Sequence, residues 1–264
     1  MWDLGEFMEY DPLLKAAVVV CTVLFLGLIA AVIAAHAVMK KRGSHAVTTR
    51  EITYGAVCLA ASFALSYIGV RLPQGGRITP ASSLPIMIYC YYFGFRRAVV
   101  VCFAYMLLQF LQSPYIYTPM SAVLDYVIPY LALIFTGVFA YKAPAKDGAT
   151  ADATDSDSAA AYNLSSVKDG VKKHARFFIG AACYIVVRYL SHVLSGAIFY
   201  SSYDLGWRVW ASWAYSFGYN SFFLIDVAIS VTAAVFVLAS KTFDRFMAVS
   251  ANTLQNADTA QKDY

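Results

Sequence analysis

Long apolar segments, separated by short polar ones, dominate the pattern of hydrophobic and polar positions along this chain. A helix that crosses a bilayer needs about 20 mostly apolar residues, whereas the strands of a membrane β-barrel alternate polar and apolar positions. The continuous apolar runs are 16–35, 52–70, 82–93, 98–110, 122–140, 177–200 and 209–240. The two shortest, 82–93 and 98–110, are typical of a helical hairpin. The pattern therefore predicts an all-α, polytopic membrane protein.

Composition excludes several other classes of protein. Hydrophobic residues make up 60% of the 264 residues and charged residues 14%, against roughly 45–50% and 25% in soluble domains. Such a chain is neither disordered, nor a nucleic-acid binder, nor an ordinary soluble enzyme. Its five cysteines are scattered without a CxxC pair, so we expect neither a metal site nor a disulfide framework.

Positive charge is distributed unevenly between the two sides that the apolar runs define. Most of the 20 lysines and arginines fall in 40–50, 96–97, 142–176 and the C-terminal segment. The positive-inside rule assigns these connections to the cytoplasm. We therefore expect a multi-pass protein of the cell (plasma) membrane with its N-terminus outside the cell and its C-terminus in the cytoplasm.

This topology divides the chain into successive segments. They are an extracellular head with an extra transmembrane helix (1–48), core helices one to four (49–142), a flexible cytoplasmic linker (143–173), core helices five and six (174–243) and a cytoplasmic tail (244–264). The linker is rich in Ala, Asp, Ser and Thr, which offer little surface to bury.

Sequence motifs of catalysis and of energy conversion are absent. The chain has no GxxxxGK[ST] phosphate loop, no HExxH and no GxSxG, motifs that hold nucleotides, zinc or a serine nucleophile. We therefore predict no catalytic residues and no cofactor. If the protein moves a solute uphill, a partner has to supply the energy.

Ionisable side chains within membrane spans are costly and are therefore candidates for function. Asp125 lies near the outer end of its predicted helix. Its carboxylate either pairs with Arg188 or serves as the counter-ion of a cationic ligand, and placement alone favours neither. His192, taken alone, is more typical of a core histidine bonded to a backbone carbonyl. Asp226 is expected to cap a helix or to pair locally.

Aromatic side chains alter this balance. The chain holds 20 Tyr, 18 Phe and 4 Trp, and an interfacial belt explains some of them. However, the outer connections 71–81, 111–121 and 201–208 converge on the end that holds Asp125. A carboxylate among aromatic faces suits a flat organic cation, since each good cation–π contact contributes about 0.5–2 kcal/mol.

One helix face adds to this candidate site. His192 and Gly196 are four residues apart, and Tyr200 follows one turn later, so the three share a face. A glycine there would let a flat ring approach the backbone closely.

Five short motifs occur in order between about residues 50 and 240. They are LPQGG (72–76), LQFLQSPYI (108–116), LDY (124–126), SHVLSGAIFY (191–200) and YS (215–216) followed by Asn220. Together they resemble the thiamine-specific S-component, the substrate-binding membrane subunit, of bacterial energy-coupling-factor transporters. The resemblance implies a six-helix core with its pocket near the outer face, to which the helix at 16–35 is additional.

The resemblance also implies partners and site residues. The partners are thiamine, a transmembrane coupling protein, two cytoplasmic ABC-type ATPases and the lipid bilayer, with no nucleic acid. The substrate-binding residues are Asp125, Tyr126, Tyr115, His192, Gly196, Tyr200, Tyr215 and Asn220, with 71–81 as a lid. A coupling motif of the family corresponds to Ala56-Val-Cys-Leu-Ala60.

Other functions remain open from the sequence. One is an S-component for another vitamin or for a thiamine precursor, and an uncharged ligand of that kind would not need Asp125. Another, from a different class, is a seven-helix sensor or receptor. A membrane enzyme is the remotest alternative, because Asp125 and His192 are the only carboxylate–histidine couple within the spans that could perform acid–base chemistry.

Overall fold

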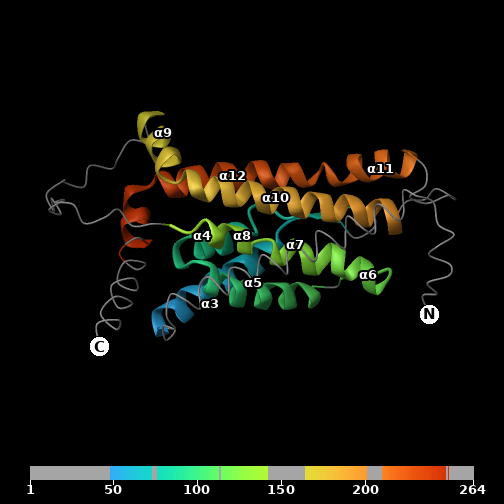
Figure 1. The fold of residues 1–264 in the computed structure, drawn as a ribbon, viewed down its shortest axis with the longest axis horizontal. Helices are drawn as coiled ribbons and strands as arrows, with labels where there is room; N and C mark the ends of the chain where they lie inside the picture. Colours follow the sequence, from blue (N-terminus) through green and yellow to red (C-terminus); the bar gives the residue numbers. More distant parts are fainter. Residues whose placement is uncertain are drawn as a thin grey trace, which may run out of the picture.

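A computed structural model describes residues 48–72, 76–112, 114–141, 164–200, 210–247 and 249. Its helices run roughly along the long axis of an elongated bundle, in which α10, α11 and α12 lie on one side and α3 and α5 on the other (Figure 1). The expected extra helix at 16–35 lies outside the described residues, as do most of the expected linker and tail.

The elements follow one another in the order that the apolar runs predict. They are α3 (Thr49–Tyr67), β1 (Val70–Arg71), β2 (Arg77–Ile78), α4 (Leu84–Phe93), α5 (Phe95–Phe110), α6 (Pro119–Ala122), the π-helix η2 (Val123–Val127), α7 (Ile128–Leu131), α8 (Ile134–Val138), α9 (Leu164–Lys173), α10 (Ala175–Ser195), the π-helix η3 (Gly196–Tyr200), α11 (Trp210–Asn220) and α12 (Phe223–Ala239). The all-α prediction is confirmed, and the one two-stranded pairing, β1 with β2, is a short antiparallel hairpin.

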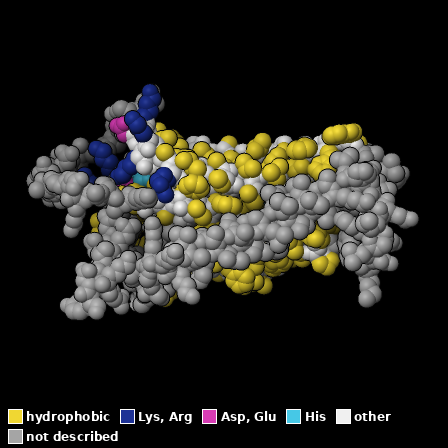
Figure 2. Space-filling view, in the orientation of Figure 1, with side chains coloured by type: hydrophobic (Ala, Val, Ile, Leu, Met, Phe, Trp, Pro, Cys, Tyr) yellow, Lys and Arg dark blue, Asp and Glu magenta, His cyan; other side chains and the backbone are white. Residues whose placement is uncertain are grey.

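Three helical segments of the described chain are long and apolar enough to cross a membrane. They are Pro119–Val138, Ala175–Tyr200 and Trp210–Ala239. In Figure 2 the coloured side chains along the bundle are mostly hydrophobic, and the lysines and arginines gather at the end that carries α9. This distribution is that of a multi-pass membrane protein.

Helix α4 is the centre of the hydrophobic core. All of its residues except Pro85 are buried, and α3, α5 and α8 pack around it. Gly94, with φ of 80°, ends α4 and begins α5, a backbone conformation that a residue with a Cβ rarely adopts. In the predicted hairpin of two short helices, the chain therefore reverses direction at this glycine.

The expected linker 143–173 is helical at its C-terminal end, where residues 164–173 form α9. The chain comes close enough to α12 there that a Cβ on Gly170 would lie 2.8 Å from the Cα of Ala239. The physical reason is local: Val167 and Val171 fall on one face at helical spacing, and apolar residues so placed pack against a neighbouring helix.

A buried polar group, which we call the Asp244 cluster, joins α4, α9 and the helical residues 241–247. Tyr92 donates a hydrogen bond of 2.9 Å to Asp244 Oδ1, and His174 Nε2 lies 3.3 Å from the same oxygen. Lys173 pairs with the other carboxylate oxygen. Burial opposes ionisation of Asp244, but the contacts with His174, Lys173 and Tyr92 outweigh it and hold its carboxyl pKa well below the usual range.

Candidate functional site

A cavity lies between the β1–β2 hairpin, α5, the η2 turn, α10 and α11. All eight residues that the sequence predicted line it: Tyr115, Asp125, Tyr126, His192, Gly196, Tyr200, Tyr215 and Asn220. The cavity volume open to the centres of water molecules is about 170 Å³, and on the same measure one water molecule needs roughly 10–15 Å³. The cavity therefore has room for a small organic molecule.

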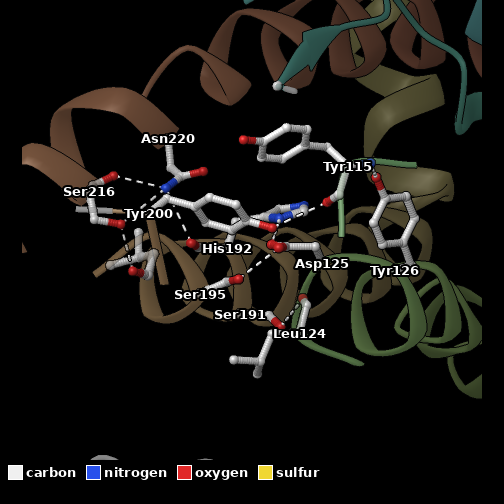
Figure 3. Close-up of polar contacts among 12 residues, drawn as sticks. Tyr115, Leu124, Asp125, Tyr126, Ser191, His192, Ser195, Tyr200, Ser216 and Asn220 are labelled. Carbon is white, nitrogen blue, oxygen red and sulfur yellow. Dashed lines mark hydrogen bonds and ion pairs between the residues drawn. The ribbon is translucent and has the colours of Figure 1, made fainter. Parts of the chain in front are cut away.

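Asp125 and His192 form a pair at the cavity wall. His192 Nδ1 lies 3.1 Å from Asp125 Oδ1, and the Ser195 hydroxyl donates a 2.6 Å hydrogen bond to Asp125 Oδ2 (Figure 3). The Asp125 and His192 side chains are 17% and 22% exposed, so the pair remains open to the cavity. The sequence left open whether Asp125 pairs with Arg188; in the structure its partners are His192 and Ser195.

The local backbone explains how Asp125 reaches this position. The sequence predicted one continuous helix over 122–140, but the chain passes through the π-helix η2 at residues 123–127 before α7 begins. Within this segment, the Ser191 hydroxyl of α10 donates a hydrogen bond of 2.5 Å to the carbonyl oxygen of Leu124. A π-turn often marks a functional site, and here the Ser191 bond joins it to α10.

Aromatic residues hold the 114–118 connection against the cavity. The Tyr200 hydroxyl donates to the Tyr115 carbonyl oxygen at 3.2 Å, and the two ring centroids are 5.7 Å apart. The Tyr115 backbone N–H donates to the Tyr126 hydroxyl at 2.9 Å. On α11, the rings of Tyr215 and Tyr219 stack 5.9 Å apart. Of the aromatic residues expected at this end, Tyr115, Tyr126, Tyr200 and Tyr215 line the cavity, and the expected connection 201–208 lies outside the described residues.

Gly196 lines the cavity, but its small size serves a contact different from the one that the sequence suggested. A Cβ on Gly196 would lie 2.3 Å from Ser216 Oγ and 3.2 Å from Asn220 Nδ2. The space beside its Cα is thus occupied by α11, not left for a flat ring. Asn220 Nδ2 donates to the His192 carbonyl oxygen at 3.2 Å, while Asn220 Oδ1 accepts no hydrogen bond from a described residue.

The hairpin expected as a lid borders the cavity. Val70 pairs with Ile78 and Arg71 with Arg77, and residues 73–75 are outside the described chain. The Gly76 N–H donates to the Tyr219 hydroxyl at 3.1 Å, and Arg77 donates to Gln112 Oε1 at 3.1 Å. These bonds join the hairpin to α11 and to the end of α5.

Sequence reasoning missed several polar residues of the cavity and its wall. They are Arg77, Gln109, Gln112, Tyr219 and, through its bond to Asp125, Ser195. Arg188, a candidate partner of Asp125 in the sequence, also lines the cavity. Helical spacing was the available signal for Ser195, which lies three residues after His192 on α10. Gln109 and Gln112 belong to the motif LQFLQSPYI, whereas Arg77 and Tyr219 come from separate elements and share no sequence pattern.

A helical membrane bundle that encloses an aromatic cavity with one carboxylate–histidine pair has the architecture of a small-molecule-binding membrane protein. Residues 52–247 match the family model described as thiamine transporter protein. That match covers well over half of the chain, which therefore belongs to the thiamine transporter protein family. This is a family of transporters, not of enzymes. Among the described residues, no group of three or more His, Cys, Asp or Glu could hold a metal ion.

Two relatives illustrate the similarity. The thiamine transporter ThiT of Bacillus subtilis is 26% identical over 197 residues, which span 73% of this chain and 91% of that protein. A solved structure of ThiT from Listeria monocytogenes matches with a TM-score of 0.53 and 19% identity, covering 75% of this chain and 96% of that one. The second similarity supports the fold.

Proposed function

We propose that this chain is the thiamine-binding subunit of an ATP-driven energy-coupling-factor transporter for vitamin uptake. The observation that carries this proposal is the Asp125–His192 pair, open to a cavity that tyrosines line. A partly buried anion beside aromatic faces favours an organic cation over a neutral molecule of the same shape. Membership of the thiamine transporter family supports thiamine as that cation.

Each side chain then has a role. Asp125 meets the charge or the amino group of thiamine, and His192 and Tyr200 flank the thiazolium ring. Tyr215 and the side-chain carbonyl oxygen of Asn220 bond to polar atoms of the ligand. Tyr115 and Tyr126 hold the neighbouring connection in place through their mutual hydrogen bond, and Gly196 sets the approach of α11.

Transport requires partners in this proposal. The sequence has no phosphate loop of its own, so a coupling protein and two ATPases supply the energy. Ala56 and Ala60 lie on α3 and are exposed, and such small residues four apart let another helix pack closely in a membrane. Co-purification of the tagged chain with a coupling protein and ATPases tests this part.

The distribution of lysine and arginine supports an orientation with the N-terminus outside and the C-terminus in the cytoplasm. In that orientation the cavity opens toward the outside. Labelling of single cysteines introduced at 77–78 and at 241–245 by a membrane-impermeant reagent on intact cells tests it. We expect labelling at the first segment alone.

Titration of thiamine into the detergent-purified full chain tests the binding proposal. Trp213 packs against the Leu124–Ile128–Leu194 cluster, beside Asp125, so its fluorescence should report binding. We expect saturable submicromolar binding of thiamine and at least about 30-fold weaker binding of its uncharged pyrimidine fragment, because the fragment lacks the cation (about 2 kcal/mol or more). Stronger binding of the fragment than of thiamine would instead indicate a subunit for a thiamine precursor. Binding of neither compound would contradict the proposal and favour another vitamin as the ligand.

A further inference from the structure

A tight turn joins the β1–β2 hairpin to α4 and forms part of the cavity wall. Thr79 and Ser82 line the cavity from this turn, and their hydroxyl oxygens lie 2.9 Å apart. The Ser82 backbone N–H donates to the Thr79 carbonyl oxygen at 3.2 Å, and the Leu84 N–H donates to that of Ala81 at 3.1 Å. The conformation of this turn therefore determines where the hairpin lies relative to α4.

Ala81 has an unusual backbone conformation within the turn. Its φ is 56°, and among the described residues it is the only residue other than glycine with a positive φ. A Cβ disfavours this left-handed region, which glycine adopts without penalty. Such conformations persist only where the surrounding structure imposes them, and they are frequent at ligand-binding sites. We therefore looked for the contact that holds Ala81 in this conformation.

That contact comes from α12. The Ala81 backbone N–H donates to Asp226 Oδ1 at 3.0 Å, and α12 also packs against β2. Asp226 is 4% exposed, and a hydrogen bond to a carboxylate is strengthened by its charge. The local partner expected for Asp226 is present in Ser230, but the hydroxyl of Ser230 is farther from Oδ1, at 3.4 Å. The stronger bond of Asp226 is thus the one to the turn.

A buried positive charge also acts on Asp226. It is that of Arg188 on α10, whose Nη1 donates to the hydroxyl of Ser83 at 3.3 Å and to that of Tyr184. Arg188 lines the cavity, whereas Asp226 does not. Asp226 therefore connects the turn to α10 and α12 from outside the cavity.

We infer that Asp226 is a positioning residue of the binding site, because its bond to Ala81 keeps the turn in the conformation that places Thr79, Ser82 and the hairpin at the cavity. Without this bond, Ala81 would return to a negative φ, which changes the direction of the chain. The bonds of the hairpin to Tyr219 and Gln112 would then loosen. The effect on ligand binding rests on the proposed function, whereas the effect on the turn does not.

Hydrogen exchange of the amides of residues 76–82 in the ligand-free, detergent-purified full chain tests the effect on the turn. In Asp226→Ala, exchange should be at least about tenfold faster than in the unaltered chain, because a charge-assisted hydrogen bond is lost. The amides of α5 provide an internal reference. A general loss of stability would accelerate exchange there to the same extent, and that result would overturn the inference.

Ala81→Gly shows whether Asp226 acts through the conformation of Ala81. Glycine adopts the same φ without penalty, so the turn then depends less on Asp226. In the Ala81→Gly background, the acceleration caused by Asp226→Ala should be at least about threefold smaller. An equal acceleration with alanine and with glycine at position 81 would overturn the inference.

Two further variants separate the contacts of Asp226. Ser230→Ala is the matched control, since it removes a bond to the same oxygen without touching the turn, and exchange of residues 76–82 should be unchanged. Asp226→Asn keeps an acceptor for the Ala81 N–H but lacks the charge, so its effect should be smaller than that of Asp226→Ala. Equal effects of these two substitutions would assign the role to the charge on Arg188 and would overturn the inference.

The rate of thiamine dissociation, followed by the fluorescence of Trp213, tests the effect on binding. Asp226→Ala should release thiamine at least about tenfold faster, and Ala81→Gly should again reduce the effect. If Asp226→Ala does not fold, Ala81→Val perturbs the same turn, because a β-branched residue is strained still more at a positive φ. Unchanged exchange and unchanged thiamine release in Ala81→Val would overturn the inference.

The two proposals fail separately. If the unaltered chain does not bind thiamine, the proposed function fails, and the exchange measurements still test the role of Asp226 in the turn. If the turn loosens in Asp226→Ala while thiamine release is unchanged, the proposed function is retained and Asp226 is not a positioning residue of the site.

Discussion

Two aspartate–histidine pairs in this protein have almost the same geometry and opposite surroundings. Asp125 Oδ1 lies 3.1 Å from His192 Nδ1 at the cavity, and Asp244 Oδ1 lies 3.3 Å from His174 Nε2 in the Asp244 cluster. The side chain of His174 is fully buried, whereas that of His192 is 22% exposed. One pair is enclosed by protein and the other faces open space.

The neighbours of each pair account for the difference. Asp244 is also bonded by Tyr92 and Lys173, and the rings of Tyr91 and Tyr141 pack around His174. The Asp244 carboxylate is thus saturated by protein. Asp125 has Ser195 as its additional partner and keeps acceptor capacity on the cavity side. A saturated pair stabilises the fold, and an unsaturated pair can bind a ligand.

The largest expected effect is on thiamine affinity, which should depend on the Asp125–His192 pair and not on the Asp244–His174 pair. Asp125→Ala should weaken thiamine binding by about 2–5 kcal/mol, at least about 30-fold, because a buried cation loses its anion. Calorimetric titration measures this, and Asp125→Asn isolates the charge because it keeps the shape. Unchanged affinity in both variants would remove Asp125 from the site.

The converse effect is on stability. Asp244→Ala should destabilise the fold by about 1–3 kcal/mol, because the hydroxyl of Tyr92 and the ring of His174 lose a buried acceptor. Thermal unfolding in detergent measures the loss. Thiamine affinity should be unaltered at a temperature where the variant is folded; a parallel loss of affinity would show that the two regions are coupled.

The same cluster predicts a dependence on pH. The pKa of Asp244 is lower in the folded chain than its ordinary value. Its contribution to the free energy of unfolding is therefore fully present above the unfolded pKa of about 3.9 and is lost as the pH falls below that value. We expect the melting temperature to be steady from pH 7 to about pH 5 and to fall in more acidic buffer. The melting temperature of Asp244→Asn should fall less steeply with decreasing pH than that of the unaltered chain. Equal slopes for the two proteins would mean that other carboxyl groups cause the loss of stability in acid.

A smaller effect concerns the wall of the cavity. Gly196→Ala places a Cβ against Ser216 Oγ, and overpacking of this kind costs about 1–3 kcal/mol. Because α11 carries Tyr215 and Asn220, its displacement should weaken thiamine binding as well as stability. The double variant Gly196→Ala/Ser216→Ala removes the clashing hydroxyl and should recover part of both. If neither stability nor thiamine affinity is recovered in the double variant, the contact with Ser216 is not the cause of the loss in Gly196→Ala.

The smallest effect tests the aromatic ring apart from its hydroxyl. Tyr200→Phe keeps the ring and loses the hydroxyl, which donates to the Tyr115 carbonyl oxygen at 3.2 Å, so affinity should fall by about 0.5–1.5 kcal/mol. Tyr200→Leu removes the aromatic face and should cost more. Equal losses in the two variants would mean that the ring does not stack on the ligand.

Much of the fold could be predicted because apolar runs report burial in lipid or protein directly. The six core helices appeared where the runs place them, and Gly94 divides α4 from α5 as the polar break at 94–97 indicates. The π-helix η2 could not be predicted, since one extra residue in a helical turn leaves no trace in hydropathy. Helix α9 was missed because its short apolar stripe lies in a polar segment.

The candidate site divides in the same way. The aromatic residues, Asp125 and His192 could be selected because polar and ionisable groups within apolar spans are few and motif spacing relates them. The partners of Asp125, the use of Gly196 for the approach of α11 and the position of Arg77 and Arg188 at the cavity could not be predicted, because each involves a contact between distant segments.

By itself, then, the sequence determined that this chain is a helical membrane protein and selected eight residues that line its cavity, since both depend on the kind and order of side chains. Only the tertiary structure decided which carboxylate is saturated and which is open. Asp125 and Asp244 are residues of the same type beside apolar helices, and what distinguishes them is the number of donors that other helices bring to each carboxylate.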